Sequence, residues 1–310
     1  MDMLIGSIIT ILLLLFIVAS YYFFHKAVVR SRKDIFKKSP DMDPDEYKIM
    51  GSPDNWMQKH GFDDIVIDSD DGLKLHGYFI KAGGGSGRTV ILAHGYSSKA
   101  FHMHSFARFY HDDLGFNVLV PDARAHGRSE GKYIGFGWLD RKDYLKWIDK
   151  AIELTGEKSS IVLHGISMGG ATVLMTVGED LPAQVKAVVS DCAYTSAYDE
   201  LSWQLKRLYH LPAFPFLYTT SFLSKLIAGY FFKEASALEQ VKKTGLPILF
   251  IHGGSDSFVP HEMVNQLYDA AVGEKELLII PDAGHGLASE VDYKTYVTRV
   301  AEFLGKYIVL

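Results

Sequence analysis

The chain has 310 residues, of which 48% are hydrophobic and 22% are charged, a balance that is typical of globular proteins and excludes a mainly disordered chain. The single cysteine, Cys192, excludes a framework of internal disulfide bonds. It ends an apolar run, so we expect a buried structural thiol. The net charge is −5, although six basic residues gather within residues 26–38. An acidic body with one short basic segment excludes a nucleic-acid-binding protein, because such proteins spread positive charge over the docking face.

The first 25 residues are predicted to form a transmembrane anchor. Residues 3–24 contain no charged side chain, and as a helix they would extend about 33 Å, enough to cross a hydrocarbon core of about 30 Å. Tyr21 and Tyr22 stand at the end of this run, where aromatic side chains favour the membrane interface. A cleaved signal peptide would place lysine or arginine before a shorter apolar run. A helix of the globular core would have a polar face, which this one lacks.

Orientation and domain boundaries follow from the same pattern. The basic residues after the anchor indicate, by the positive-inside rule, a single-pass membrane protein with its main domain in the cytoplasm and membrane lipid as a partner. We expect an anchor at 1–25, a basic juxtamembrane neck with a connector helix at 26–60, and one globular domain at 61–310. Because the first strand is expected near Asp64, removal of residues 1–38 should leave a folded, active protein.

The globular domain is predicted to have an α/β fold. Alternating apolar residues on both sides of the turn Asp71-Gly72 predict an antiparallel hairpin at 64–68 and 73–80. Short continuous apolar runs then alternate with helical stretches, which is typical of a mostly parallel sheet flanked by helices. We expect these further strands at 89–93, 117–120, 160–163, 185–189, 247–251 and 276–280, and helices at 101–112, 137–154, 168–178, 261–272 and 289–306.

One long aromatic segment, at about 195–233, interrupts this alternation. It is too long for a simple crossover and too aromatic for a solvated loop. We interpret it as a helical cap that covers a pocket, with ordinary helices packed on the sheet as the alternative. Its aromatic side chains Trp203, Phe214, Phe216 and Phe222 are expected to roof the pocket.

A candidate nucleophile lies between a predicted strand and a predicted helix, in Gly165-Ile-Ser167-Met-Gly169. A sharp strand-to-helix turn presents a serine hydroxyl to a base, and glycines two residues before and after relieve the crowding of its strained backbone. The pentapeptide alone is a weak signal. Its position between a buried strand and a helix makes Ser167 the predicted nucleophile.

A candidate acid and base follow in the chain order typical of such sites, nucleophile, acid, histidine. Asp256 and His285 each lie in a loop beyond a predicted buried strand, so in a parallel sheet both loops reach the same edge as Ser167. His285 would accept the serine proton, and Asp256 would orient the imidazole. Asp282 is a rival acid, but it lies only three residues before His285 and ranks behind Asp256.

The negatively charged oxygen of a tetrahedral intermediate needs backbone N–H donors. One is predicted at Met168, at the start of the helix after Ser167. The other is predicted at Tyr96, in the loop after the strand at 89–93. His94 in that loop is expected to be structural.

In combination, several segments resemble the signature motifs of the α/β-hydrolase superfamily, most closely its serine-aminopeptidase-like, monoacylglycerol-lipase-like and prolyl-oligopeptidase-like members. The segments are 94–96, 121–131, 165–170, 191–196, 251–256 and 283–286. The resemblance covers about residues 64–304. It implies a triad of Ser167, Asp256 and His285, an oxyanion hole at Tyr96 and Met168, and a structural loop that contains Arg124, His126 and Arg128.

We therefore predict a membrane-anchored serine hydrolase that cleaves small-molecule acyl esters, either lipid-like or with short to medium acyl chains. A serine peptidase or amidase of the same fold is one alternative, and a non-catalytic membrane-tethered binding module is another. No cofactor or metal is expected, because neither His-Glu-x-x-His nor Cys-x-x-Cys occurs.

Overall fold

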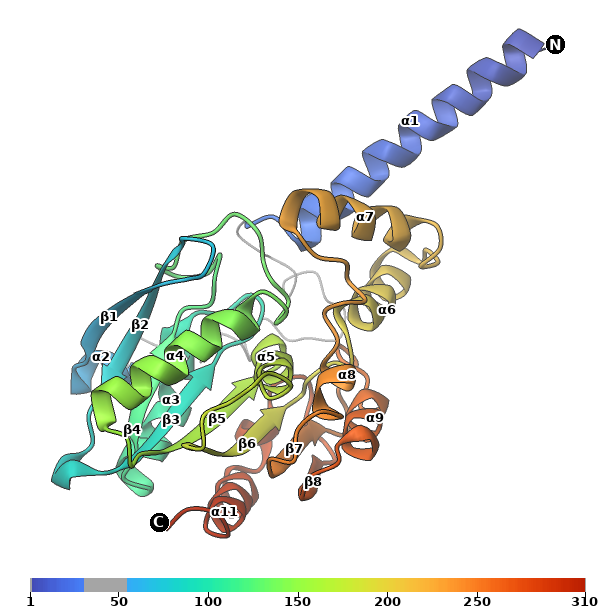
Figure 1. The fold of residues 1–310 in the computed structure, drawn as a ribbon. Coiled ribbons are helices and arrows are strands. Elements are labelled where there is room, and N and C mark those ends of the chain that lie inside the picture. The colour runs from blue at the N-terminus through green and yellow to red at the C-terminus, as the bar shows by residue number, and fades with distance from the viewer. Residues whose placement is uncertain (1, 31–54, 310) are drawn as a thin grey trace.

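The computed structural model describes residues 2–30 and 55–309 of the chain (Figure 1). Most of the predicted basic neck therefore lies outside the described residues. Of the predicted connector helix, the described part is α2 (Trp56–His60).

Eight strands form one sheet, in the order β1-β2-β4-β3-β5-β6-β7-β8. The pairs β1–β2 and β2–β4 are antiparallel, and every other neighbouring pair is parallel. The strands are β1 (Asp63–Asp68), β2 (Lys74–Ile80), β3 (Arg88–Ala93), β4 (Asn117–Pro121), β5 (Ser160–Ile166), β6 (Val185–Asp191), β7 (Ile248–Gly253) and β8 (Lys275–Ile280). The predicted mostly parallel sheet with an antiparallel hairpin at one edge is confirmed.

Both faces of the sheet are buried. Successive side chains of a strand point to opposite faces, and each face packs into a core of its own. Ile91 of β3 packs into one core, whereas its neighbours Val90 and Leu92 pack into the other. The first core also contains side chains from α4 (Asp140–Thr155), α5 (Met168–Thr176), α8 (Ala237–Val241) and α9 (Glu262–Ala270). The second contains side chains from α2, α3 (His104–Arg108), α10 (Ala288–Val291) and α11 (Tyr293–Leu304). Burial on both faces explains why these strands read as continuous apolar runs.

Two predicted helices are divided in the structure. The segment predicted at 101–112 consists of a 3₁₀ turn η4 (Ala100–Met103), helix α3 and a π turn η5 (Phe109–Asp113). The segment predicted at 289–306 forms α10 and α11. Asp292 separates these two helices, because its side chain accepts a hydrogen bond from the Thr295 N–H and so caps the start of α11.

The N-terminal segment forms helix α1 (Asp2–Ala27), which projects from the body of the molecule (Figure 1). Within the described residues, no helix combines the length and the apolar character needed to cross a membrane, so the predicted transmembrane helix is not supported. The end of α1 instead packs onto the globular domain. Phe24 and Val28 are buried in the first core, and the Ser20 and Thr219 hydroxyls share a hydrogen bond of 2.6 Å. Removing residues 1–38 would therefore remove core side chains.

The aromatic segment at 195–233 contains two helices, α6 (Ala197–Tyr209) and α7 (Phe216–Ala228). Helix α7 packs against α1, and the three helices lie on the same side of the molecule (Figure 1). The end of the segment packs against the sheet, since Tyr230 and Phe232 are buried in the first core.

Candidate active site

Ser167 lies in the turn between β5 and α5, with φ 58° and ψ −118°. This is a strained conformation for a residue with a side chain. The turn is tight, because a Cβ at Gly165 would overlap the Gly169 carbonyl, and a Cβ at Gly169 would overlap the Ala93 carbonyl. Glycine is thus required at both flanking positions, for the reason that the sequence pattern indicates. The turn holds Ser167 at the carboxyl edge of the sheet.

The three residues predicted as nucleophile, base and acid form one hydrogen-bonded chain. His285 Nε2 lies 2.8 Å from Ser167 Oγ, and His285 Nδ1 lies 2.8 Å from Asp256 Oδ2. Because a carboxylate only accepts hydrogen bonds, Nδ1 carries the proton in neutral His285 and Nε2 is free to accept the proton of Ser167. Asp282, the rival acid, is exposed, and the aspartate hydrogen-bonded to His285 is Asp256.

Asp256 is a buried carboxyl group with several hydrogen-bond donors. Its Oδ1 accepts hydrogen bonds of 2.9 Å from the N–H groups of Phe258 and Val259. Burial raises the pKa of the Asp256 carboxyl, but the charge interaction with His285 and the hydrogen bonds from His252 and His285 outweigh it and hold the pKa below its usual range. Asp256 is therefore ionised at neutral pH and stabilises the imidazolium form of His285.

His252, at the end of β7, is a further residue of this site to which the sequence pattern assigns no role. Its Nε2 lies 3.2 Å from Asp256 Oδ2 and 2.9 Å from the Val259 carbonyl oxygen. Burial lowers the pKa of His252, but its hydrogen bond and charge interaction with Asp256 raise it above the ordinary value. The sequence contains a signal for this contact, since His252 ends the strand before the Asp256 loop and precedes Asp256 by four residues.

The loop after β3 lies beside the nucleophile. A Cβ built on Gly95 would be 3.5 Å from the Ser167 Cβ, and Tyr96 and Met168 line the same pocket as Ser167. His126 Nε2 is hydrogen-bonded to the Tyr96 carbonyl oxygen, which fixes the backbone of this loop. The two predicted oxyanion residues are thus adjacent to Ser167.

The other motif residues of these loops, His94, Arg124 and Arg128, make structural contacts. His94 Nε2 accepts a hydrogen bond of 3.0 Å from the Ala123 N–H, and burial lowers the pKa of His94 to about 3, so its imidazole is neutral. Arg124 pairs with Asp71 and Asp143, while the guanidinium of Arg128 pairs with Asp64.

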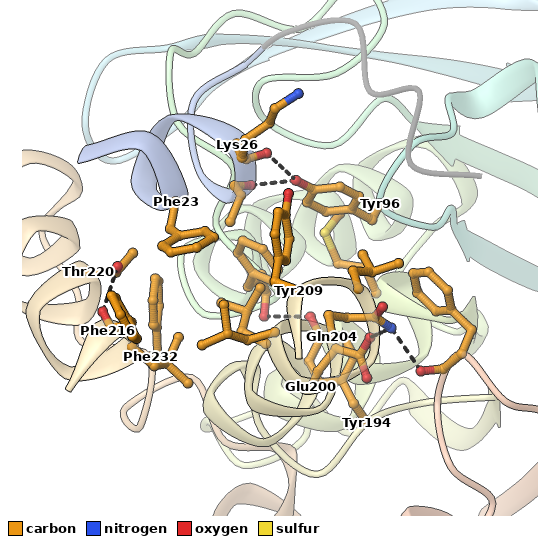
Figure 2. A pocket seen from close by; sticks show the side chains of 18 of the residues that line it. Phe23, Lys26, Tyr96, Tyr194, Glu200, Gln204, Tyr209, Phe216, Thr220 and Phe232 are labelled. Atoms are coloured by element: carbon orange, nitrogen blue, oxygen red, sulfur yellow. Dashed lines mark hydrogen bonds between the residues drawn. The ribbon is translucent and has the colours of Figure 1, made fainter. Parts of the chain in front are cut away.

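Ser167 lines a pocket of about 550 Å³, a volume typical of small-molecule sites. Figure 2 shows side chains that line this pocket. Its walls come from the end of α1, from α6 and α7, and from the loops at the sheet edge. Most of the lining side chains are apolar or aromatic: Tyr22, Phe23, Ala27, Tyr96, Phe136, Met168, Tyr194, Leu201, Leu205, Leu208, Tyr209, Phe216, Leu217, Phe232, Phe258 and Val259. The end of the N-terminal helix thus forms part of this pocket.

The cap covers the pocket with different aromatic side chains from those expected. Of the four named from the sequence, Phe216 lines the pocket. Phe214 and Phe222 are not among the residues that line it, and both are exposed. Trp203 instead donates a hydrogen bond of 2.9 Å to the Ser257 carbonyl oxygen, so it ties α6 to the loop that contains Asp256.

Cys192 is buried, as predicted. Its sulfur lies close to the side chains of Asp256 and His285, in a group whose ligand-type atoms are within 4.8 Å of one another. Burial raises the pKa of the Cys192 thiol, so the sulfur stays protonated and is a poor metal ligand.

Comparison with known proteins agrees with this geometry. A family model described as alpha/beta hydrolase fold matches residues 88–220. The uncharacterized protein YqkD of Bacillus subtilis is 31% identical over 279 residues, which cover 89% of this chain and 87% of YqkD. The chain belongs to the α/β-hydrolase family.

Solved structures place esterases among the neighbours of this hydrolase. The Pyrococcus furiosus esterase Pf2001 is 26% identical, with a TM-score of 0.66, and the match covers 84% of this chain and 94% of the esterase. An acylaminoacyl peptidase of Pyrococcus horikoshii shares the fold, with 18% identity and a TM-score of 0.57 over 79% of this chain and 41% of the peptidase.

Proposed function

We propose that this hydrolase cleaves carboxylic esters through an acyl-enzyme intermediate on Ser167. The observation that carries the proposal is the hydrogen-bonded chain of Ser167, His285 and Asp256, which opens onto an apolar pocket. Similarity to the esterase Pf2001 supports the same reaction class.

The geometry fits a two-step reaction. His285 Nε2 accepts the proton of Ser167 Oγ as this oxygen attacks the ester carbonyl carbon, and Asp256 stabilises the resulting imidazolium. His285 then returns the proton to the alcohol oxygen as the carbon–oxygen bond breaks, which leaves the acyl group on Ser167. A water molecule, activated by His285 in the same way, releases the acid and regenerates the hydroxyl of Ser167.

Backbone N–H groups of Tyr96 and Met168 are the proposed donors to the negatively charged oxygen of the intermediate. Met168 is the first residue of α5, and the first N–H groups of a helix have no partner within it. The helix dipole adds favourable potential for a negative charge at this position.

The substrate is proposed to be an ester with an apolar acyl chain. Aromatic and aliphatic side chains from α1, α6 and α7 surround most of the pocket, so each added methylene should gain roughly 0.8 kcal/mol of binding until the pocket is full. For p-nitrophenyl esters, kcat/KM should rise from acetate to a short or medium acyl chain and then fall. Acetate as the best substrate would contradict an acyl pocket, and strong cleavage of peptide amides with weak ester turnover would establish the peptidase alternative.

Labelling with a fluorophosphonate probe tests the nucleophile. The wild-type protein and Ser105→Ala, a control at an exposed serine of α3, should be labelled, whereas Ser167→Ala should not. Ester turnover by Ser167→Ala should fall about 10³-fold or more, because only binding and oxyanion stabilisation remain. A labelled Ser167→Ala protein would place the nucleophile elsewhere, and a wild type that neither labels nor turns over esters would favour the binding-module alternative.

We also propose that the protein associates with a membrane through α1 and α7. Large apolar side chains are exposed on both helices, which pack against each other: Leu14, Ile17 and Val18 on α1, and Phe222 and Leu226 on α7. Contiguous exposed apolar surface is typical of lipid or protein contacts. The protein should sediment with membranes and be released by detergent; release by salt alone would contradict a lipid contact. The cytoplasmic location of the hydrolase domain stays a prediction, which protease accessibility in intact cells and in lysed cells would test.

A further inference from the structure

The carboxyl group of Glu200 on α6 lies in the wall of this mostly apolar pocket, whose lining also includes Lys26 on α1. Glu200 lines the pocket (Figure 2). Ser167 lines the same pocket, and Glu200 is only 5% exposed. One carboxyl oxygen, Oε1, accepts a hydrogen bond of 2.7 Å from the Gln204 Nε2 group. The other, Oε2, has no hydrogen-bond partner among the described residues. Within that part of the chain it is the only buried side-chain oxygen or nitrogen without a partner whose residue lines this pocket.

Gln204 is itself held firmly, which fixes the position of Glu200. Its Nε2 group also donates to the Phe258 carbonyl oxygen at 2.9 Å, and its Oε1 accepts from the guanidinium of Arg207 at 3.0 Å. This network defines the orientation of the Gln204 amide and uses its hydrogen-bonding capacity. Gln204 therefore orients one oxygen of Glu200 and leaves the other, Oε2, without a partner in the wall of the pocket.

An unpartnered carboxyl oxygen in a buried apolar site is unfavourable for folding. Leu201 and Leu205, on the same helix, line the same pocket, so a leucine at position 200 would suit its surroundings better. A buried polar group that the fold leaves unsatisfied requires an explanation, and a polar group of a bound substrate would supply the missing partner.

We propose that Glu200 Oε2 binds a neutral hydroxyl group of the substrate, so that the preferred ester carries a hydroxyl in addition to its apolar chain. This inference rests on the proposed esterase function and specifies its substrate class. Glu200 is a specificity residue here and takes no part in the proton transfers of Ser167 and His285.

The protonation state favours a hydroxyl over an amine. Burial, together with the negative charges of Asp256 and Asp199, raises the pKa of Glu200 to about 8, although Gln204 and the positive charge of Arg207 act in the opposite direction. At neutral pH the carboxyl group is therefore mostly uncharged and can both donate and accept a hydrogen bond. A hydroxyl can do the same, whereas an ammonium group would require a carboxylate.

The test compares matched esters in the wild type and in two kinds of variant. The first substrate pair is an aryl alkanoate and its hydroxy derivative, with the hydroxyl moved along chains of four to eight carbons. The second is a propyl ester and the corresponding 3-hydroxypropyl ester, which places the hydroxyl on the alcohol. Glu200→Leu and Glu200→Met remove the polar group, and either one suffices if the other does not fold. Glu200→Gln keeps a donor and an acceptor.

For at least one pair, the ratio of kcat/KM for the hydroxy ester to that for the plain ester should fall about tenfold in Glu200→Leu or Glu200→Met, as expected for loss of a buried hydrogen bond. The ratio should change less than threefold in Glu200→Gln. The pair that responds identifies whether the hydroxyl belongs to the acyl or the alcohol part. A ratio unchanged in every pair would overturn the inference. A preference, dependent on Glu200, for esters in which an amino group replaces the hydroxyl would also overturn it. If the wild type cleaves no ester at all, the proposed function itself has failed; if it cleaves plain esters with an unchanged ratio, only the hydroxyl site has.

Discussion

Replacing Phe24 by alanine tests whether the end of α1 belongs to the hydrolase domain. The Phe24 side chain is 1% exposed in the first core, with its ring centroid 5.9 Å from that of Tyr133. Truncating a buried phenylalanine costs about 3–5 kcal/mol. In a domain of this size each kcal/mol lowers the melting temperature by about 2 °C. We therefore expect Phe24→Ala to melt about 6–10 °C below the wild type.

Tyr21→Ala is the matched control, because Tyr21 lies one turn earlier on the same helix and is 57% exposed. Surface substitutions change the free energy of unfolding by about 0.5 kcal/mol or less, so this variant should melt within about 1 °C of the wild type. Thermal unfolding followed by circular dichroism measures both shifts. Equal melting temperatures for the two variants and the wild type would refute the packing of α1 on the domain.

Two further predictions concern buried carboxyl groups. Asp256→Asn should lower kcat about 10⁴-fold, because the amide no longer favours the productive tautomer of His285; a variant with a tenth of wild-type kcat would exclude Asp256 as the acid. Glu200→Gln should raise the melting temperature, by an amount that grows from about pH 4.5 to about pH 8. The pKa of Glu200 is about 8 in the fold and ordinarily 4.5. Over that pH range the unfolded wild type releases the proton that the folded protein keeps, so the wild type loses stability while the glutamine variant does not. A gain that is constant from pH 4.5 to 8 would contradict the raised pKa.

The sequence predicted the sheet and the candidate nucleophile well because both depend on local pattern. Strands buried on two faces produce continuous apolar runs, and the predicted strand positions differ from the observed ones by three residues or fewer at either end. The turn at Ser167 requires glycine on both sides for steric reasons that are visible in five residues. Parallel topology then brings the loops that contain Ser167, Asp256 and His285 to one edge of the sheet.

The pocket was harder to predict, because its walls join distant segments of the chain. Aromatic content identified the cap, but content does not say which side of a helix faces inward, so Phe216 was placed correctly and Phe222 was not. The role of Glu200 depends on Gln204 on its own helix and on the loop that carries Phe258, a long-range contact that no local motif encodes.

The apolar N-terminal run is a second case in which local composition does not reveal a contact with a distant part of the chain. Its composition resembles that of a separate anchor, yet the final turns of α1 contribute Phe23 and Ala27 to the wall of the pocket. The Tyr96 hydroxyl donates a hydrogen bond to the Ala27 carbonyl oxygen (Figure 2), and Tyr96 is also the proposed oxyanion donor. The position of α1 is thereby coupled to the loop that would stabilise the reaction intermediate. If α1 contacts a membrane, a shift of the helix at the lipid surface would change both the shape of the acyl pocket and the alignment of Tyr96 with Ser167.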